Sequence, residues 1–185
     1  TCGPEGAYLF FALAVPGVKH AAVYGPMSTR TVAGVASAIG VPAGHVHVPI
    51  VASTSDGSAA GPLVLAVQAA LSADDRRPIA DYVTVSAAPI TAYAITATLR
   101  VGAGADVGAV KAEAERRLAA HAARQHRAGG LVLRSALFGA AYVPDAKGAS
   151  IVEEVVLTTP AADVNPGAYG APFCTAITVT VEVVD

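Results

Sequence analysis

Alternating apolar and polar positions predict two strands in the second half of the chain. In residues 91–101 every odd position from Tyr93 onward is apolar, while threonines and an arginine alternate with them. Residues 175–183 repeat the pattern, with apolar odd positions from Ile177 to Val183 and with Thr178, Thr180 and Glu182 between them. Successive side chains of a strand point to opposite faces, so both segments are expected to be strands that face water on one side.

Helical spacing dominates the region between these strands. Asp106 is placed to cap the first turn of a helix, and Arg124 and Arg127 suit the negative end of its dipole. Gly129-Gly130 is expected to end it. The helix is predicted over residues 106–126, and its apolar positions recur at the spacing of one helix face: Val107, Val110, Ala114, Leu118 and Ala122.

The first half of the chain follows a similar plan less clearly. Pro89 marks the joint between the halves, and Ala87-Ala88-Pro89 is too short for a flexible linker. We therefore expect an α+β protein of two small docked domains, residues 1–88 and 89–185, each a two-layer sandwich with helices on one face of a mixed or antiparallel sheet. The predicted elements of the first domain are helices 5–14 and 59–71 and strands 18–24, 46–52 and 82–86; those of the second are strands 91–101, 151–157 and 175–183 and helices 106–126 and 134–141.

A series of short motifs resembles one protein family. An apolar helix stops at Asp74-Asp75-Arg76-Arg77-Pro78 and a strand follows through Val83-Thr84-Val85, an order that resembles the baseplate J-like family of contractile phage tails. Near the end, Leu157-Thr158-Thr159-Pro160-Ala161-Ala162-Asp163 and a strand from Cys174 resemble that family's Leu-Thr-Ser-Pro-Ala-Ala-Asp motif, loop and last strand. Further pieces in the expected order are residues 3–8, 18–23, 93–99 and 134–137. Residues 27–48 depart from the family pattern through an insertion at 29–39 and a turn at 40–44.

The resemblance implies a structural protein. It points to a wedge subunit of a phage-type contractile tail baseplate, in a ring around the central hub that contacts copies of itself and other wedge proteins. It also implies the carboxyl-terminal part of a longer family member, located in the virion tail baseplate and assembled in the host bacterial cytoplasm. Catalysis, cofactors, metals, nucleic acid and membranes are not expected. The source stays open among a phage, a prophage and a tail-derived injection system.

Composition agrees with an assembly component. Hydrophobic residues make up 54% of the chain and charged residues 14%, so the surface is expected to keep apolar patches of the kind that contact partners. The net charge of −2 provides no basic field for duplex nucleic acid. Apolar windows fall short of the about 18 to 20 residues that a membrane span needs.

Histidine pairs are the first candidates for chemistry. His45 and His47 lie two apart, so on a strand both rings share a face and offer two metal ligands. No Cys, Asp or Glu beside them in the sequence completes the site, so two surface histidines are the preferred interpretation. His121 and His126 are expected to be solvated helix residues.

Carboxylates, nucleophiles and glycine motifs give no catalytic set. Asp74 and Asp75 are expected to be exposed and screened by Arg76 and Arg77. Glu153 and Glu154 adjoin each other on a strand and therefore face opposite sides. Neither a nucleophile-elbow motif nor a phosphate-binding loop occurs. The sequence Gly102-x-Gly104 lacks a third glycine at the dinucleotide-binding position, because Gly108 comes one residue late, so it is predicted to be a turn.

Arginines, cysteines and loops leave alternatives open. The arginines 116, 117, 124 and 127 suit either an acidic partner or helix-dipole matching and solubility. Cys2 and Cys174 are expected to be free thiols. The turn-rich loops 53–58 and 165–172, with Tyr169, support the alternative function of a small-molecule or glycan-binding module without catalysis.

Overall fold

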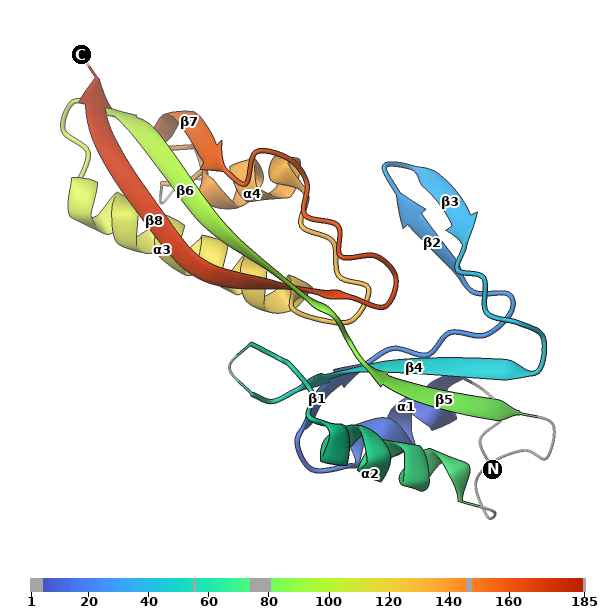
Figure 1. The fold of residues 1–185 in the computed structure, drawn as a ribbon. Coiled ribbons are helices and arrows are strands. Elements are labelled where there is room, and N and C mark those ends of the chain that lie inside the picture. The colour runs from blue at the N-terminus through green and yellow to red at the C-terminus, as the bar shows by residue number, and fades with distance from the viewer. Residues whose placement is uncertain (1–4, 55, 74–80, 146–147, 185) are drawn as a thin grey trace. The chain divides into compact units, whose positions relative to one another are not determined.

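The computed structural model describes residues 5–54, 56–73, 81–145 and 148–184. The chain divides into two compact units (Figure 1). The first unit consists of Thr1–Ile90 together with Arg127–Gly130 and Pro166–Ala171. The second consists of Thr91–His126, Leu131–Asn165 and Pro172–Asp185. Two short segments of the second half of the sequence therefore complete the core of the first unit.

A three-stranded mixed sheet forms the centre of the first unit. Its order is β1 (Val18–Ala21), β4 (His45–Ala52) and β5 (Tyr82–Ala87), with β1 antiparallel and β5 parallel to β4. The helices α1 (Glu5–Leu13) and α2 (Gly61–Ser72) lie on the same side of this sheet (Figure 1). Residues 48–52 of β4 are all buried, as expected for the central strand of a sheet. The core of this layer contains Tyr8, Ala12, Val48, Ile50, Val67, Leu71, Val83 and Val85.

The insertion at residues 29–39 is a β-hairpin, which the sequence pattern did not predict. Strands β2 (Thr29–Val32) and β3 (Val35–Ala38) pair antiparallel as a separate two-stranded sheet. Ala33 and Gly34 connect them with φ angles of 50° and 81°, the left-handed conformation that two-residue hairpin turns require. Every residue of β3 is exposed, so the hairpin has no buried alternation for a sequence pattern to reveal.

A second mixed sheet forms the centre of the second unit. Its order is β7 (Val152–Thr159), β6 (Ile90–Gly102) and β8 (Ala171–Val184), with β7 antiparallel to β6. Strand β8 runs in the same direction as β6 (Figure 1), in agreement with two cross-strand contacts that share a sequence separation of 82 residues. The sheet is therefore mixed, and the α+β class expected from the sequence is confirmed.

Helices cover one face of this second sheet. The sequence predicts that every second residue of β6 from Tyr93 to Val101 faces inward. These residues are buried, and they pack against α3 (Val107–Gln125) and α4 (Arg134–Ala141). The Asp106 carboxylate accepts a hydrogen bond from the Ala109 N–H at 3.0 Å, which confirms the predicted cap of α3. The opposite face, which carries Arg100, is left to solvent on its outer strands.

Candidate functional site

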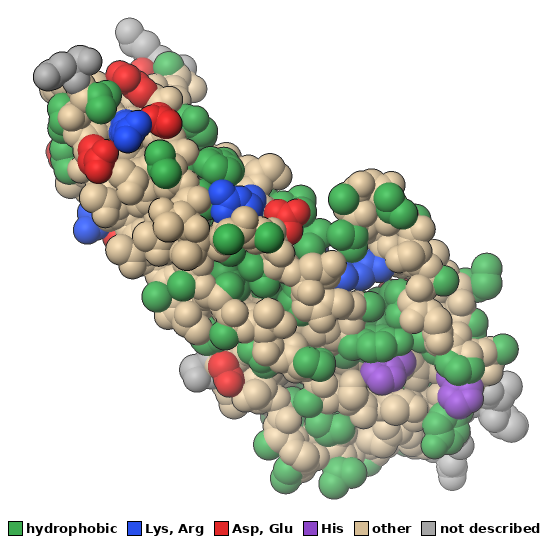
Figure 2. Space-filling view, turned by 45° about the horizontal axis from the view of Figure 1, so that its top comes forward, with side chains coloured by type: hydrophobic (Ala, Val, Ile, Leu, Met, Phe, Trp, Pro, Cys, Tyr) green, Lys and Arg blue, Asp and Glu red, His purple; other side chains and the backbone are tan. Residues whose placement is uncertain are grey.

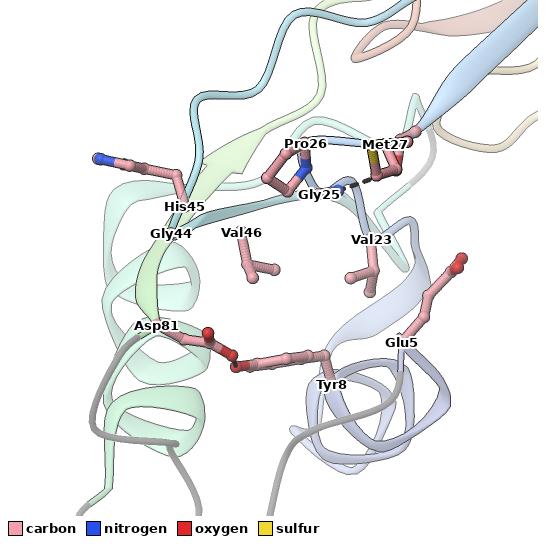
Figure 3. A pocket seen from close by; sticks show the side chains of 11 residues that line it. Glu5, Tyr8, Val23, Gly25, Pro26, Met27, Gly44, His45, Val46 and Asp81 are labelled. Atoms are coloured by element: carbon pink, nitrogen blue, oxygen red, sulfur yellow. Dashed lines mark hydrogen bonds between the residues drawn. The ribbon is translucent and has the colours of Figure 1, made fainter.

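A cavity of about 560 Å³ opens in the first unit (Figure 3). Its floor comes from α1 and the start of β5, and its walls come from the segment after β1 and the start of β4. Val23 and Val46 give the cavity apolar sides, while Glu5 and Asp81 place carboxylates at its margin. Met27, which is 91% exposed, lies at its upper rim.

One strong hydrogen bond fixes the floor of this cavity. The Tyr8 hydroxyl donates to the Asp81 carboxylate, with 2.5 Å between the oxygens. The Tyr8 ring is buried in the core, so the bond ties α1 to the residue that precedes β5. Tyr8, from one piece of sequence that carries the family resemblance, thus meets Asp81, which lies just before the resembling strand that ends at Val85. The bond uses a charged acceptor, which makes it stronger than a neutral one.

The cavity is suited to binding and offers little chemistry. The His45 side chain points away from it (Figure 3). The Ser28 hydroxyl accepts a hydrogen bond from the Gly25 N–H at 2.9 Å, and no base lies beside it among the residues that line the cavity. Apolar walls with carboxylates at the margin suit the binding of a partner or a small ligand.

The two histidines of β4 have aromatic and hydroxyl neighbours. The His45 ring lies 4.9 Å from the Tyr82 ring, centroid to centroid. The His47 Nε2 lies 2.9 Å from the Ser86 hydroxyl, and burial lowers the pKa of His47. Both histidines are half-buried. Within the ranges that the structure describes, no group of three or more His, Cys, Asp and Glu side chains gathers as metal ligands would.

The His47–Ser86 pair resembles part of a nucleophilic site and lacks its remainder. The two side chains stand on neighbouring parallel strands, and the Tyr169 ring lies 4.4 Å from the His47 ring. Among the described residues no carboxylate contacts His47, so nothing orients the imidazole as the base of a catalytic triad requires.

Tyr169 and its loop fold back onto their own chain. The Tyr169 ring is half-buried, and it contacts the ring of Tyr24 as well as that of His47. The Tyr24 hydroxyl donates to the carbonyl oxygen of Ala168 at 2.8 Å, and the Gly129 N–H donates to that of Gly170 at the same distance. The loop 165–172 therefore packs onto its own unit, and its tyrosine is not free to contact a ligand as a protruding side chain would be. This packing of the loop removes the main support for the alternative function of a glycan-binding module.

His121 and His126 are buried, which contradicts the expectation that they are solvated. Each retains 7% of its exposed area. The His126 ring lies 5.2 Å from the Phe173 ring. The Nε2 atom of His121 has no hydrogen-bond partner, and burial, followed by the charge of Arg124, lowers the pKa of His121. The apolar period of α3 does not include these positions, so the buried face of the helix is wider than the pattern indicated.

The arginine cluster predicted on α3 is divided. Arg116, Arg117 and Arg124 line a hollow of about 260 Å³ in the second unit, whereas Arg127 belongs to the first. Arg116 forms an ion pair with Glu113 at 2.6 Å, and the Nε of Arg117 donates to the carbonyl oxygen of Ala140 at 2.9 Å. Arg116 is therefore neutralised by its ion pair, and Arg117 binds a carbonyl at the carboxyl end of α4, where a positive charge is favourable.

The remaining candidates show no catalytic arrangement. Arg100 pairs with Glu154 at 2.5 Å and with Glu182 at 3.4 Å on the open face of the second sheet. Gly102 lies at the end of β6, and Gly104, with a φ of 91°, lies in the turn that follows. The predicted charges Asp74 to Arg77 and the thiol of Cys2 lie outside the described residues. The thiol of Cys174 is half-buried, and burial raises its pKa.

The last two resemblance pieces also meet in space. The Asp163 carboxylate accepts a hydrogen bond from the backbone N–H of Arg134 at 2.8 Å and so caps α4. The guanidinium of Arg134 donates to the carbonyl oxygens of Pro160 and Leu157. The motif Leu157–Asp163 is therefore the partner of the first turn of α4, which explains the carboxylate at Asp163.

Apolar side chains lie on the surface of both units. Figure 2 shows hydrophobic side chains scattered over the visible face, with few charged ones between them. No described helix is both long and apolar enough to cross a membrane. The exposed large hydrophobic side chains are those of Phe10, Leu13, Met27, Val35, Leu65, Tyr82, Val107, Tyr142, Val156 and Val183.

Comparison with known proteins agrees with this anatomy. The baseplate J-like central domain matches residues 1–87, and the baseplate J-like protein C-terminal domain matches residues 93–180. Baseplate protein J of Escherichia phage P2 is 35% identical over 130 residues, which cover 70% of this chain and 41% of that protein. The chain thus spans less than half the length of this relative. With two successive domains of one family in order along it, the chain belongs to the baseplate J-like family.

Proposed function

We propose that this chain is a structural part of a contractile phage tail baseplate and that it catalyses no reaction. The observation that carries the proposal is the ordered match of two baseplate J-like domains over nearly the whole chain. The structure adds support, because motifs behind the match form tertiary contacts, such as the bond between Tyr8 and Asp81.

The proposed role is mechanical. A baseplate must hold its subunits in one packing before contraction and allow another packing afterwards, so its parts act through surfaces that bind neighbours. Exposed apolar side chains such as Phe10, Val35 and Leu65 are available for such contacts. We propose other baseplate wedge proteins and further copies of this chain as the neighbours.

Labelling in intact particles tests the proposal. An affinity tag placed in the β2–β3 turn at Gly34, where an added side chain meets no atom within 4 Å, can be decorated with gold and imaged. The label is expected at the baseplate end of the tail. Label on the capsid, or on no particle, would reject the proposal.

The 560 Å³ cavity supports a second candidate, a binding module for a small ligand. Its volume falls in the range of small-molecule sites. A ligand that binds only the folded state raises the unfolding temperature by mass action. A screen of sugars and small amines by thermal shift therefore separates the two candidates. A concentration-dependent shift that Asp81→Asn abolishes would favour the binding module.

A further inference from the structure

Edge strands are where a sheet can add a strand from another chain. Their outward N–H and C=O groups lack a neighbour within the sheet, and proteins that stay monomeric cover or disrupt such edges. The two three-stranded sheets of this protein end in β1 and β5 and in β7 and β8. The four edges differ in how well they are protected.

Both edges of the first sheet are protected. On β5, the side-chain amide of Gln68 donates to the carbonyl oxygen of Val83 at 2.9 Å and accepts from the N–H of Val85 at 2.8 Å. A glutamine from α2 thus occupies the groups that an added strand would need. Strand β1 has four residues and an irregular register between Val18 and His20, so it offers little to pair with.

The β7 edge of the second sheet is also disrupted. Its register with β6 shifts at two places, and such irregularities bend and twist an edge strand. Glu153 and Glu154 place two carboxylates on it, and Pro160 follows its last residue, Thr159. Charges and proline are common means by which edges are kept from pairing.

The β8 edge has none of these protections over most of its length. The strand has 14 residues, with a proline only at its second position and Glu182 as its single charged residue. Among the described strands β6 is its only neighbour, as Figure 1 shows. Its solvent side presents the uncharged residues Thr178 and Thr180.

We propose that β8 pairs antiparallel with β8 of a second copy of this chain, so that two second sheets become one continuous sheet. This inference rests on the proposed assembly role and names a surface for it. A two-fold axis that joins like faces must pass through one residue position of the strand. The position follows from the side chains left uncovered.

Uncovered apolar side chains select the register. On the core side of β8, Val179 is buried, whereas Val183 is 52% exposed and Ile177 is half-buried. Setting Val183 opposite the partner subunit's Ile177 covers both. The same register places Thr180 opposite the partner's Thr180 and Glu182 opposite the partner's Thr178. The carboxylate then meets a hydroxyl donor and no second carboxylate, so the strand is complementary to itself.

Charge reversal at one position tests this register. Thr178→Lys sets a cation opposite the partner's Glu182, whereas Thr178→Glu sets two carboxylates opposite each other. Both changes alter the same exposed side chain. Since each contact occurs twice in the dimer, the lysine variant should dimerise about tenfold more tightly than the glutamate variant in sedimentation equilibrium of the full-length protein. Thr158→Lys and Thr158→Glu, on exposed β7, are the matched controls and should not differ. Equal dimerisation of the Thr178 pair, or monomers for both, would overturn the proposal.

Cross-linking tests the axis independently. In a background of Cys2→Ser and Cys174→Ser, Thr180→Cys should form a disulfide dimer on mild oxidation, because each cysteine faces its own copy. Thr178→Cys should not, because it faces Glu182. A cross-link that forms equally at both positions, or at neither, contradicts the register.

The outcomes separate this inference from the proposed function. If the tagged protein is at the baseplate while the Thr178 variants associate equally, only the β8 contact is wrong. If Thr180→Cys cross-links but the tag is absent from tails, the pairing stands and the proposed function fails.

Discussion

The imidazole of His121 is a polar group on the buried face of α3, and its Nε2 atom has no hydrogen-bond partner. Burial holds its pKa below the ordinary value of 6.5, and the same cause lowers the pKa of His20 and His47. The unfolded chain therefore binds protons at a higher pH than the folded one. Stability from these groups is complete above pH 6.5 and declines as the pH falls below it.

This linkage gives a prediction about acid sensitivity. The unfolding temperature should fall between about pH 7 and about pH 5, a window above the titration of ordinary carboxylates. His121→Leu removes one of the groups and fills its site with an apolar side chain, so its unfolding temperature should depend less on pH. Lys111→Gln, an exposed change near the start of the same helix, serves as the control, because Lys111 is not among the groups that lower the pKa of His121. A pH slope that His121→Leu leaves unchanged would contradict the assignment.

Gly129 shows a second residue-scale constraint. Its φ is 74°, and a Cβ atom there would lie 2.5 Å from the Tyr24 hydroxyl. Gly129→Ala should therefore destabilise the protein by about 1–3 kcal/mol in chemical denaturation. Gly167→Ala is the matched control, because Gly167 has a φ of 86° and open space around it, so only backbone strain applies. Equal losses for the two variants would mean that the contact with Tyr24 carries no weight.

Residue types alone revealed some of these constraints and concealed others. The cap at Asp106 was predictable, because a short acidic side chain before an apolar helical period has one usual role. The burial of His121 was not, because imidazole is common on both exposed and buried helix faces. The contact of Tyr24 with Ala168 joins residues 144 apart, and no local pattern encodes such a pairing.

At the scale of elements, the side-chain amide of Gln68 makes hydrogen bonds at the edge of β5 that a neighbouring strand would otherwise make. Gln68→Glu keeps the acceptor for the Val85 N–H but replaces the donor to the Val83 carbonyl with a second acceptor. It should cost about 1–3 kcal/mol, since a half-buried carbonyl then loses its partner. Leu65→Gln, on the exposed side of the same helix, should change stability by less than about 0.5 kcal/mol. Thermal and urea unfolding measure both, and a neutral Gln68→Glu would contradict the proposed role of the amide.

Element prediction succeeded where periodicity was strong. The inward row of β6 and the helix α3 follow directly from spacings of two and of three to four residues. The β2–β3 hairpin was not predicted, because its strands have four residues each and every residue of β3 is exposed. The exposure of Val183, on the core side of β8, was not predicted either, because alternation identifies a face but not whether a neighbouring element covers it.

At the scale of the whole molecule, the first unit is built from several separate segments of the chain. Buried Ala128 and Ala171 pack with Val51 and Ala88 in a small core cluster of the first unit. We propose residues 1–88 and 89–185 as its two domains, with the segments 127–130 and 166–171 serving the first. The sequence predicts a division at Pro89 but does not predict these returning segments, because alanine and glycine carry no signal for the core they join.

Hydrogen exchange tests this shared core. The N–H of Ala171 donates to the carbonyl oxygen of Pro89 at 2.9 Å, and that of Gly129 to Gly170 at 2.8 Å. Both amides should be protected as strongly as β4 and should respond to denaturant together with it. Exchange at the rate of an exposed loop would show that the segments are not part of the first unit.

The claim that this chain works as a building block of a tail is tested most directly by a reconstruction of the intact contractile particle. We expect density at the baseplate that accommodates both units, with the β8 edge against a second copy and no substrate in the cavity lined by Tyr8 and Asp81. Absence of the chain from every part of the tail, in particles that still assemble and contract, would contradict the account.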